Sequence, residues 1–233
     1  MTHPRIRLWD LPTRLFHWLL ALCVAAALIS AQIGGDFMDW HGRIGLFIVG
    51  LVVFRLVWGV MGSTYARFAQ FFPTPARLKA FKSGAWRGVG HNPLGALSVL
   101  ALLGLLAFQA TSGLFSNDDI SYVGPLADLV SKDMSNRLTG LHKLASNGIY
   151  LLIGLHLVAI VFYALVKKDN LVKPMVTGWK DVEQADQVPA ATGGGALALI
   201  VALGLAAAAV YGASGLWLPV PPPSPPVIET TGS

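Results

Sequence analysis

Charged residues are scarce in this sequence. Only 12% of its 233 residues are Asp, Glu, Lys or Arg, whereas 54% are hydrophobic. A soluble domain usually carries about 25% charged residues. The composition therefore argues against a soluble globular protein and predicts an all-α membrane protein that crosses the bilayer several times.

Cysteine is almost absent as well. Cys23 is the single cysteine and lies within an apolar run. One thiol can form neither an intramolecular disulfide nor a cysteine-based zinc or iron–sulfur site. We therefore expect Cys23 to be a small core residue.

Acidic residues are missing from the apolar runs. A metal-ion transporter needs carboxylates or histidines clustered near the middle of the membrane, so this absence disfavours transport. The net charge of +5 could indicate nucleic-acid binding, but basic residues beside apolar runs more often reflect membrane orientation. No nucleic-acid partner is predicted, and membrane lipid is the expected surrounding.

Five apolar runs are long enough to span a hydrocarbon core of ~30 Å. They cover residues 15–35, 41–62, 94–115, 144–166 and 196–218. The segments assigned to the inner side carry twelve Lys and Arg, and the outer loops carry two, Lys132 and Arg137. This asymmetry predicts a bacterial inner-membrane protein with a cytoplasmic N-terminus and a periplasmic C-terminus.

The segment 139–166, which contains the fourth run, carries two histidines and is the most informative stretch. His142 and His156 are 14 residues apart, so a helix places them ~21 Å apart and within ~40° of the same face. In the predicted topology His17 lies level with His156 near the inner side, and His41 lies level with His142 near the outer side.

Histidine inside a span is costly unless it faces the protein interior and has a partner. Any one of these histidines alone is explained by snorkelling or helix capping. Four histidines at two matched depths instead predict two bis-histidine haem b sites, because a haem in a bundle needs two axial ligands from facing helices. The predicted iron ligands are His17 with His156, and His41 with His142.

Three further basic residues are candidates for the same sites. Arg55 follows His41 by 14 residues and so reaches the level of the inner pair, where it either neutralises a haem propionate or snorkels to the headgroups. Arg43 and Lys143, beside the outer ligands, are weaker candidates for the same task.

His91 precedes the third run and is either an interfacial histidine or a proton-handling group at a quinone pocket.

Several motifs resemble those of the bacterial cytochrome b561 and nickel–iron hydrogenase cytochrome b-subunit family. The resemblance covers about residues 5–180 and rests on WDLPTRLFHW at 9–18, DWH at 39–41, RLVWG at 55–59, GHNP at 90–93, and LH at 141–142 and at 155–156. It implies a four-helix core that binds two b-type haems through the same four histidines and exchanges electrons with membrane quinone. The fifth run lies outside this minimal core.

The resulting hypothesis divides the chain into four parts. Residues 1–170 form a four-helix diheme cytochrome b domain, 171–195 a flexible cytoplasmic linker, 196–218 a fifth transmembrane helix, and 219–233 a proline-rich periplasmic tail. The predicted function is electron transfer across the membrane between quinone and a periplasmic redox protein, such as a cytochrome c or a hydrogenase. The alternatives are a superoxide-oxidising cytochrome b and a non-redox membrane anchor.

Overall fold

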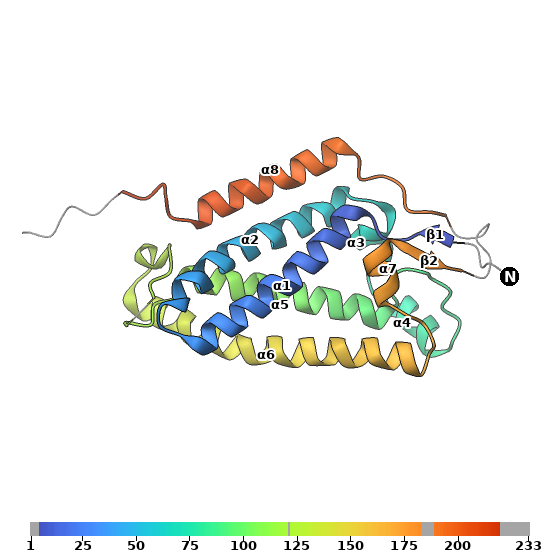
Figure 1. Cartoon of the computed structure of the whole chain (residues 1–233), viewed down its shortest axis with the longest axis horizontal. Coiled ribbons are helices and arrows are strands. Elements are labelled where there is room, and N and C mark those ends of the chain that lie inside the picture. The colour runs from blue at the N-terminus through green and yellow to red at the C-terminus, as the bar shows by residue number, and fades with distance from the viewer. Residues whose placement is uncertain (1–4, 121, 183–188, 220–233) are drawn as a thin grey trace, which may run out of the picture.

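The protein is described here from a computed structural model, which describes residues 5–120, 122–182 and 189–219. The proline-rich tail, apart from Pro219, and the middle of the predicted linker lie outside these residues. "Inner" denotes the end of the molecule that carries β1, α4 and α7, and "outer" the opposite end, following the predicted topology (Figure 1).

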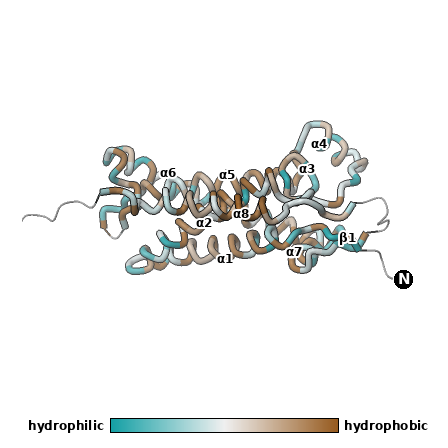
Figure 2. The backbone as a smooth tube through the Cα atoms, turned by 90° about the horizontal axis from the view of Figure 1, so that it is seen from above, coloured by the Kyte–Doolittle hydropathy of each residue, from teal (hydrophilic) through white to brown (hydrophobic). Residues whose placement is uncertain are grey.

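Five long helices make up most of the fold. They are α1 (Leu11–Ile33), α2 (Phe37–Met61), α5 (Pro93–Leu114), α6 (Lys132–Leu165) and α8 (Ala196–Ala213). Each is long and apolar enough to cross a membrane, and hydrophobic residues predominate along their middle parts (Figure 2). The prediction of an all-α membrane protein with five spans is confirmed.

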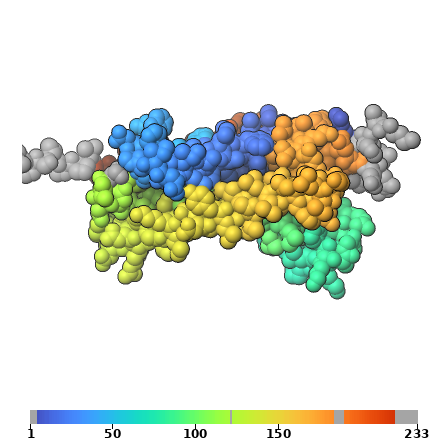
Figure 3. All heavy atoms as spheres, turned by 60° about the horizontal axis from the view of Figure 1, so that its bottom comes forward, coloured from blue at the N-terminus to red at the C-terminus, as the bar shows by residue number. Residues whose placement is uncertain are grey.

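Short elements occupy the connections. They are β1 (Arg5–Arg7), η1 (Thr64–Ala66), α3 (Phe68–Phe71), α4 (Pro75–Lys82), η2 (Ala127–Leu129), α7 (Val172–Thr177) and β2 (Trp179–Asp181). The predicted basic inner loop at 63–93 contains η1, α3 and α4 and protrudes at one end of the molecule (Figure 3).

Two helix boundaries differ from the prediction. Residues 36–40 were expected to form an outer turn, but α2 begins at Phe37 because Gly34 and Gly35, with φ of 70° and 54°, complete the reversal by themselves. The predicted outer loop at 116–138 is also shorter, since α6 begins at Lys132 behind an N-cap at Ser131.

The helices pack in chain order around one apolar centre. α1 packs on α2, α2 on α5, and α5 on α6. Buried side chains from all four helices meet there: Val24, Ile48, Val52, Leu103, Leu106 and Ile149. This centre lies between the two levels at which the histidines were predicted, so the bundle holds both levels in one rigid frame.

α8 packs against α2 on the side away from α6 (Figure 1). Small residues allow the close approach: a Cβ on Gly50 would lie 2.8 Å from the side chain of Val210, and Ala202 and Ala206 are buried in the contact. The Ala- and Gly-rich sequence of the fifth run therefore serves helix packing, as such residues do in membranes.

The inner end is tied together by segments far apart in the chain. β1 pairs antiparallel with β2, with Arg5 opposite Asp181, and the Ala191 N–H donates to the carbonyl of Arg7. The Lys173 ammonium, followed by Arg5, holds the pKa of the Asp181 carboxyl below its usual value. Within residues 171–195, α7, β2 and Ala191 are thus ordered and anchored to the N-terminal segment by backbone hydrogen bonds, and the role of this segment as a cytoplasmic linker stays a prediction.

Candidate cofactor site

The structure brings the four histidines together in the two pairs that their depths predict. The ring centroids of His17 on α1 and His156 on α6 are 6.5 Å apart. Those of His41 on α2 and His142 on α6 are 6.0 Å apart. One continuous helix thus contributes one histidine to each pair.

These separations suit two imidazoles bound to a single metal ion. An imidazole nitrogen lies ~2 Å from the metal it binds and the ring centroid ~1 Å behind that nitrogen, which places two opposed rings ~6 Å apart. Among the described residues no group of three or more His, Cys, Asp or Glu could hold a bare metal ion. Each pair is therefore suited to an ion whose remaining ligands come from a macrocycle.

Hydrogen bonds fix the outer pair in the form that binds iron. Nδ1 of His41 lies 2.9 Å from the carbonyl oxygen of Ala27, and Nδ1 of His142 lies 2.9 Å from that of Gln109. A carbonyl only accepts, so each Nδ1 carries the proton and each Nε2 carries the lone pair, which in His142 lies 3.0 Å from the side-chain nitrogen of Gln109. Metal-binding histidines commonly have this second contact.

A cavity of about 440 Å³ adjoins the outer pair. This volume lies in the range of small-molecule and cofactor sites. Its wall includes Gly45, beside which there is open space, and Gly113, where a Cβ would come within 3.0 Å of the His142 ring. Glycine at these two positions leaves room for both the ring and a flat cofactor.

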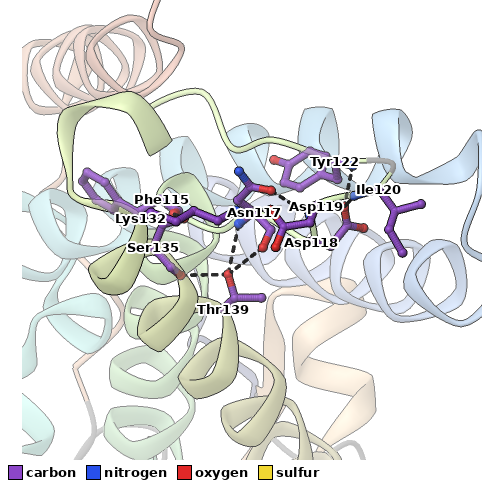
Figure 4. Close-up of polar contacts among 9 residues, drawn as sticks. All are labelled: Phe115, Asn117, Asp118, Asp119, Ile120, Tyr122, Lys132, Ser135 and Thr139. Carbon is purple, nitrogen blue, oxygen red and sulfur yellow. Dashed lines mark hydrogen bonds and ion pairs between the residues drawn. The ribbon is translucent and has the colours of Figure 1, made fainter.

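The loop that precedes α6 is held by polar contacts (Figure 4) and contributes residues to the wall of this cavity. The Asp118 carboxylate accepts hydrogen bonds from the backbone of Ile120 and Tyr122, and Thr139 joins the loop to α6 through Asn117. Asp118 and Tyr122 line the cavity. Burial, with a smaller contribution from Asp39, raises the pKa of Tyr122, so its hydroxyl stays protonated at the rim.

A comparison with known families agrees with this arrangement. The family described as prokaryotic cytochrome b561 matches residues 8–178, which include all four paired histidines. The chain belongs to this family. Membership implies a b-type haem, and the two histidine pairs fit that cofactor by their separation and donor chemistry.

Two relatives are hydrogenase subunits by name. The chain is 21% identical over 136 residues to the probable Ni/Fe-hydrogenase 1 B-type cytochrome subunit of Escherichia coli K12, covering 45% of this chain and 57% of the relative. It is 24% identical over 213 residues to the probable Ni/Fe-hydrogenase B-type cytochrome subunit of Azotobacter chroococcum mcd 1, covering 75% and 88%. The chain thus spans little more than half the length of the E. coli relative. No solved structure matches it.

The inner pair of this cytochrome b561 family member has different surroundings. Nδ1 of His17 is buried and has no hydrogen-bond partner among the described residues. The Trp18 ring meets the His17 ring edge-on at 5.1 Å. Packing rather than a backbone acceptor therefore orients His17.

Arg55 is buried close to the inner end of the bundle. Its side chain is only 4% exposed, its guanidinium lies 4.7 Å from the Phe68 ring centroid, and its Nη1 has no partner among the described residues. This burial argues against snorkelling to the headgroups. An unpaired donor on a buried cation suits an anionic group such as a haem propionate.

Arg43 does not occupy the place predicted for it. It is exposed, its guanidinium lies 5.3 Å from the ring centroid of Trp40, and it is not one of the residues that line the outer cavity. Lys143 lines that cavity instead. The helix turn around His41 directs Arg43 outwards, which spacing along the chain alone does not reveal.

His91 lies between two aromatic rings. Its ring centroid is 4.7 Å from that of Trp9 and 4.6 Å from that of Phe71, and its Nδ1 is buried without a partner in the part of the chain that the structure describes. Burial, followed by the charge of Arg55, holds the pKa of His91 well below its usual value, so the ring is neutral. It lines a second cavity of about 160 Å³ with Tyr65, Arg77 and Trp86.

Sequence reasoning missed two groups at these sites. Gln109 supplies the carbonyl that fixes His142, and its side-chain nitrogen lies 3.0 Å from Nε2 of the same histidine. Asp10 caps α1 and also binds Trp58, as its carboxylate oxygens accept from Thr13 N–H at 2.6 Å and from Trp58 Nε1–H at 3.0 Å. The polarity of Gln109 within an apolar run was the available signal.

Proposed function

We propose that this protein transfers electrons across the membrane through two b-type haems. His41 and His142 hold the outer haem, and His17 and His156 hold the inner one. The observation that carries the proposal is the pairing of two histidines of α6 with histidines of α1 and α2 at centroid separations of 6.5 and 6.0 Å. When bound, each haem supplies a one-electron iron couple.

The remaining residues of the two sites bind and orient the haems. Helix α6 keeps the two levels ~21 Å apart along one rigid element, and the apolar centre of the bundle excludes water between them. Arg55 neutralises a propionate of the inner haem. Of the two candidates at the outer haem, Lys143 rather than Arg43 takes this task, since Lys143 lines the cavity.

We infer the redox partners from the orientation of the protein in the membrane and from the names of its relatives. The Lys and Arg distribution favours a bacterial inner membrane with the outer haem towards the periplasm. Two relatives are named as hydrogenase cytochrome subunits, which favours a periplasmic hydrogenase-like donor over a cytochrome c. Quinone in the membrane is the second redox partner.

Electron transfer across a sealed bilayer tests this function. Purified protein is reconstituted into liposomes that contain trapped ferricyanide, and a reductant that does not cross the membrane is added outside. We expect ferricyanide reduction only with haem-loaded protein. The His156→Ala variant, which retains only the outer haem, should no longer reduce the trapped ferricyanide. A rate equal to that of protein-free liposomes would contradict the proposal.

His91 is the group we place at the quinone. Its neutral ring has a buried nitrogen without a partner among the described residues, and the residue lines a cavity with Tyr65 and Trp86. We predict that His91→Ala keeps both haems and slows quinone-coupled turnover ~5–10-fold, the equivalent of one hydrogen bond of about 1–1.5 kcal/mol. Arg43→Gln, at the other end of the bundle, is the control and should leave turnover unchanged. Unchanged turnover in His91→Ala would remove this residue from the quinone site.

The fifth helix should be dispensable for haem binding. α8 contacts the face of α2 away from α6 (Figure 1), and in a membrane its loss exposes apolar side chains such as Leu51 and Phe54 only to lipid. A chain that ends after Val182 retains β2. We predict that it inserts and keeps both haems but no longer associates with its redox partner. Haem loss in a correctly inserted truncation would place α8 in the cofactor core.

A further inference from the structure

Ser112 on α5 lies beside the ring of His142. Its side chain is buried, at 2% exposure, and its hydroxyl donates to the carbonyl oxygen of Gln109 at 3.1 Å. The same carbonyl accepts from Nδ1 of His142 at 2.9 Å, and the Ser112 oxygen lies 3.2 Å from that nitrogen. Carbonyl, hydroxyl and imidazole thus contact one another in a triangle, which we call a serine clip.

A second serine clip occurs at His41. Ser30 on α1 is buried, at 4% exposure, and donates to the carbonyl oxygen of Ala27 at 3.0 Å. That carbonyl accepts from Nδ1 of His41 at 2.9 Å, and the Ser30 oxygen lies 3.5 Å from the same nitrogen. In both clips the serine follows the accepting residue by three positions, and the histidine lies on the next long helix. The same local arrangement therefore serves both outer histidines.

The hydroxyl of a serine clip prepares a helix carbonyl for a partner outside its own helix. A carbonyl within a helix points along the axis and accepts from the N–H four residues later. A serine that bonds back to a carbonyl of the preceding turn bends the helix locally, which tilts this carbonyl away from the axis. Since a carbonyl oxygen has two lone pairs, the tilted group can also accept from an imidazole on the neighbouring helix.

Packing alone does not account for these two serines. A hydroxyl buried in an apolar span costs free energy unless it is hydrogen-bonded, and alanine would fill nearly the same space without that cost. His17 of the inner pair has no such clip, because its Nδ1 has no partner among the described residues. Ser30 and Ser112 therefore belong with the histidines that they accompany.

The two pairs also differ in the angle between their rings. The imidazole planes of His41 and His142 cross at 84°, whereas those of His17 and His156 are inclined at 50°. The hydrogen bond at the second nitrogen of a metal-binding imidazole fixes the orientation of its ring. Rotation of the His142 ring would break its contacts with the carbonyl and with Ser112 together. The clips thus oppose rotation of the crossed rings.

We propose that Ser30 and Ser112 are positioning residues that hold the two outer imidazoles crossed and direct each Nε2 towards the iron of the outer haem. This inference rests on the proposed function, because it concerns the ligands of one of the two haems. Neither serine lines the outer cavity, so both act through the histidines. Ser112 has the shorter contact with its histidine and the larger expected effect.

Electron paramagnetic resonance of the oxidised, haem-loaded protein tests this role. In ferric haem with two axial imidazoles, crossed rings give a strongly anisotropic signal with a high maximal g value, and rings closer to parallel give a lower one. The outer signal is the one that His142→Ala loses. We expect Ser112→Ala to lower its maximal g value and to leave the inner signal in place, which shows that the bundle is folded. Haem transfer from the outer site to apomyoglobin should become about 10-fold faster, the lower end of the effect of losing such a contact.

Matched substitutions separate the hydroxyl from the shape of the side chain. Threonine keeps an oxygen that can bond back to the same carbonyl, and valine has nearly the same shape without it. Ser112→Thr should therefore keep the wild-type outer signal, and Ser112→Val should reproduce the change seen in Ser112→Ala. Ser214→Ala removes a hydroxyl that bonds back to the carbonyl of Tyr211 at the end of α8. It is the control and should leave both signals in place.

Two results would overturn the inference and leave the proposed function intact. One is an outer signal that does not move in Ser112→Ala, and the other is an equal change in Ser112→Thr and Ser112→Val, each in protein with two haems per chain. If Ser112→Ala does not accumulate, Ser30→Ala provides the same test, and an unmoved outer signal there would also overturn the inference. A wild-type protein without b-type bands would instead overturn the proposed function.

Discussion

His142→Ala is expected to halve the haem content of the purified protein, from two haems per chain to one. His142 pairs with His41 alone, at a centroid separation of 6.0 Å, and the inner pair lies more than three helical turns away along α6. One axial imidazole and a cavity do not replace a bis-histidine site. The outer haem is therefore lost while the inner haem remains.

Three comparisons make this result specific. His41→Ala should reproduce it, because both residues serve the same iron. The double variant His41→Ala with His142→Ala should bind no less haem than either single variant. His91→Ala should retain two haems, because His91 has no histidine partner. The molar ratio of haem to protein, measured for each variant, tests this prediction. Two haems per chain in the double variant would show that the pairing is wrong.

Asp10→Ala should produce the largest loss of stability among changes outside the haem ligands. Asp10 caps α1 through Thr13 N–H and accepts a hydrogen bond from the buried indole of Trp58. Loss of the cap costs about 1 kcal/mol, and leaving the Trp58 N–H buried without an acceptor costs about 1–3 kcal/mol. We expect a fall of about 2–4 kcal/mol in the free energy of unfolding.

Ser131→Ala is the matched control for this change. Ser131 caps α6 in the same way, by accepting from Met134 N–H, but it is exposed and has no counterpart to Trp58. Its replacement should cost about 0.5–1 kcal/mol. Unfolding followed in detergent by Trp fluorescence compares the two variants. Equal losses would mean that the contact between Asp10 and Trp58 does not stabilise the fold.

The histidine pairs could be predicted from the sequence because helix geometry is constant. Once the positive residues fixed the direction of each span, the rise per residue set the depth of His17, His41, His142 and His156. Depth alone was enough to match them. The structure brings together the same pairs, and their role as iron ligands is part of the proposal.

Other features depend on contacts that no local pattern encodes. The pairing of β1 with β2 joins residues 172 to 176 positions apart, so residues 171–195 read as a flexible linker in sequence. Asp10 has the appearance of an ordinary N-cap, and its partner Trp58 is 48 residues away. Arg43 was assigned to the cofactor by position, but the rotation of α2 turns it outwards over Trp40.

The number of haems per chain tests the central claim most directly. Full-length protein is purified from membranes with haem supplied during expression, and its haem is quantified as the pyridine complex together with a reduced-minus-oxidised spectrum. The two histidine pairs predict sharp b-type bands and two haems per chain. A value of one would contradict the two-site arrangement on α6, and a protein without b-type bands would contradict the account as a whole.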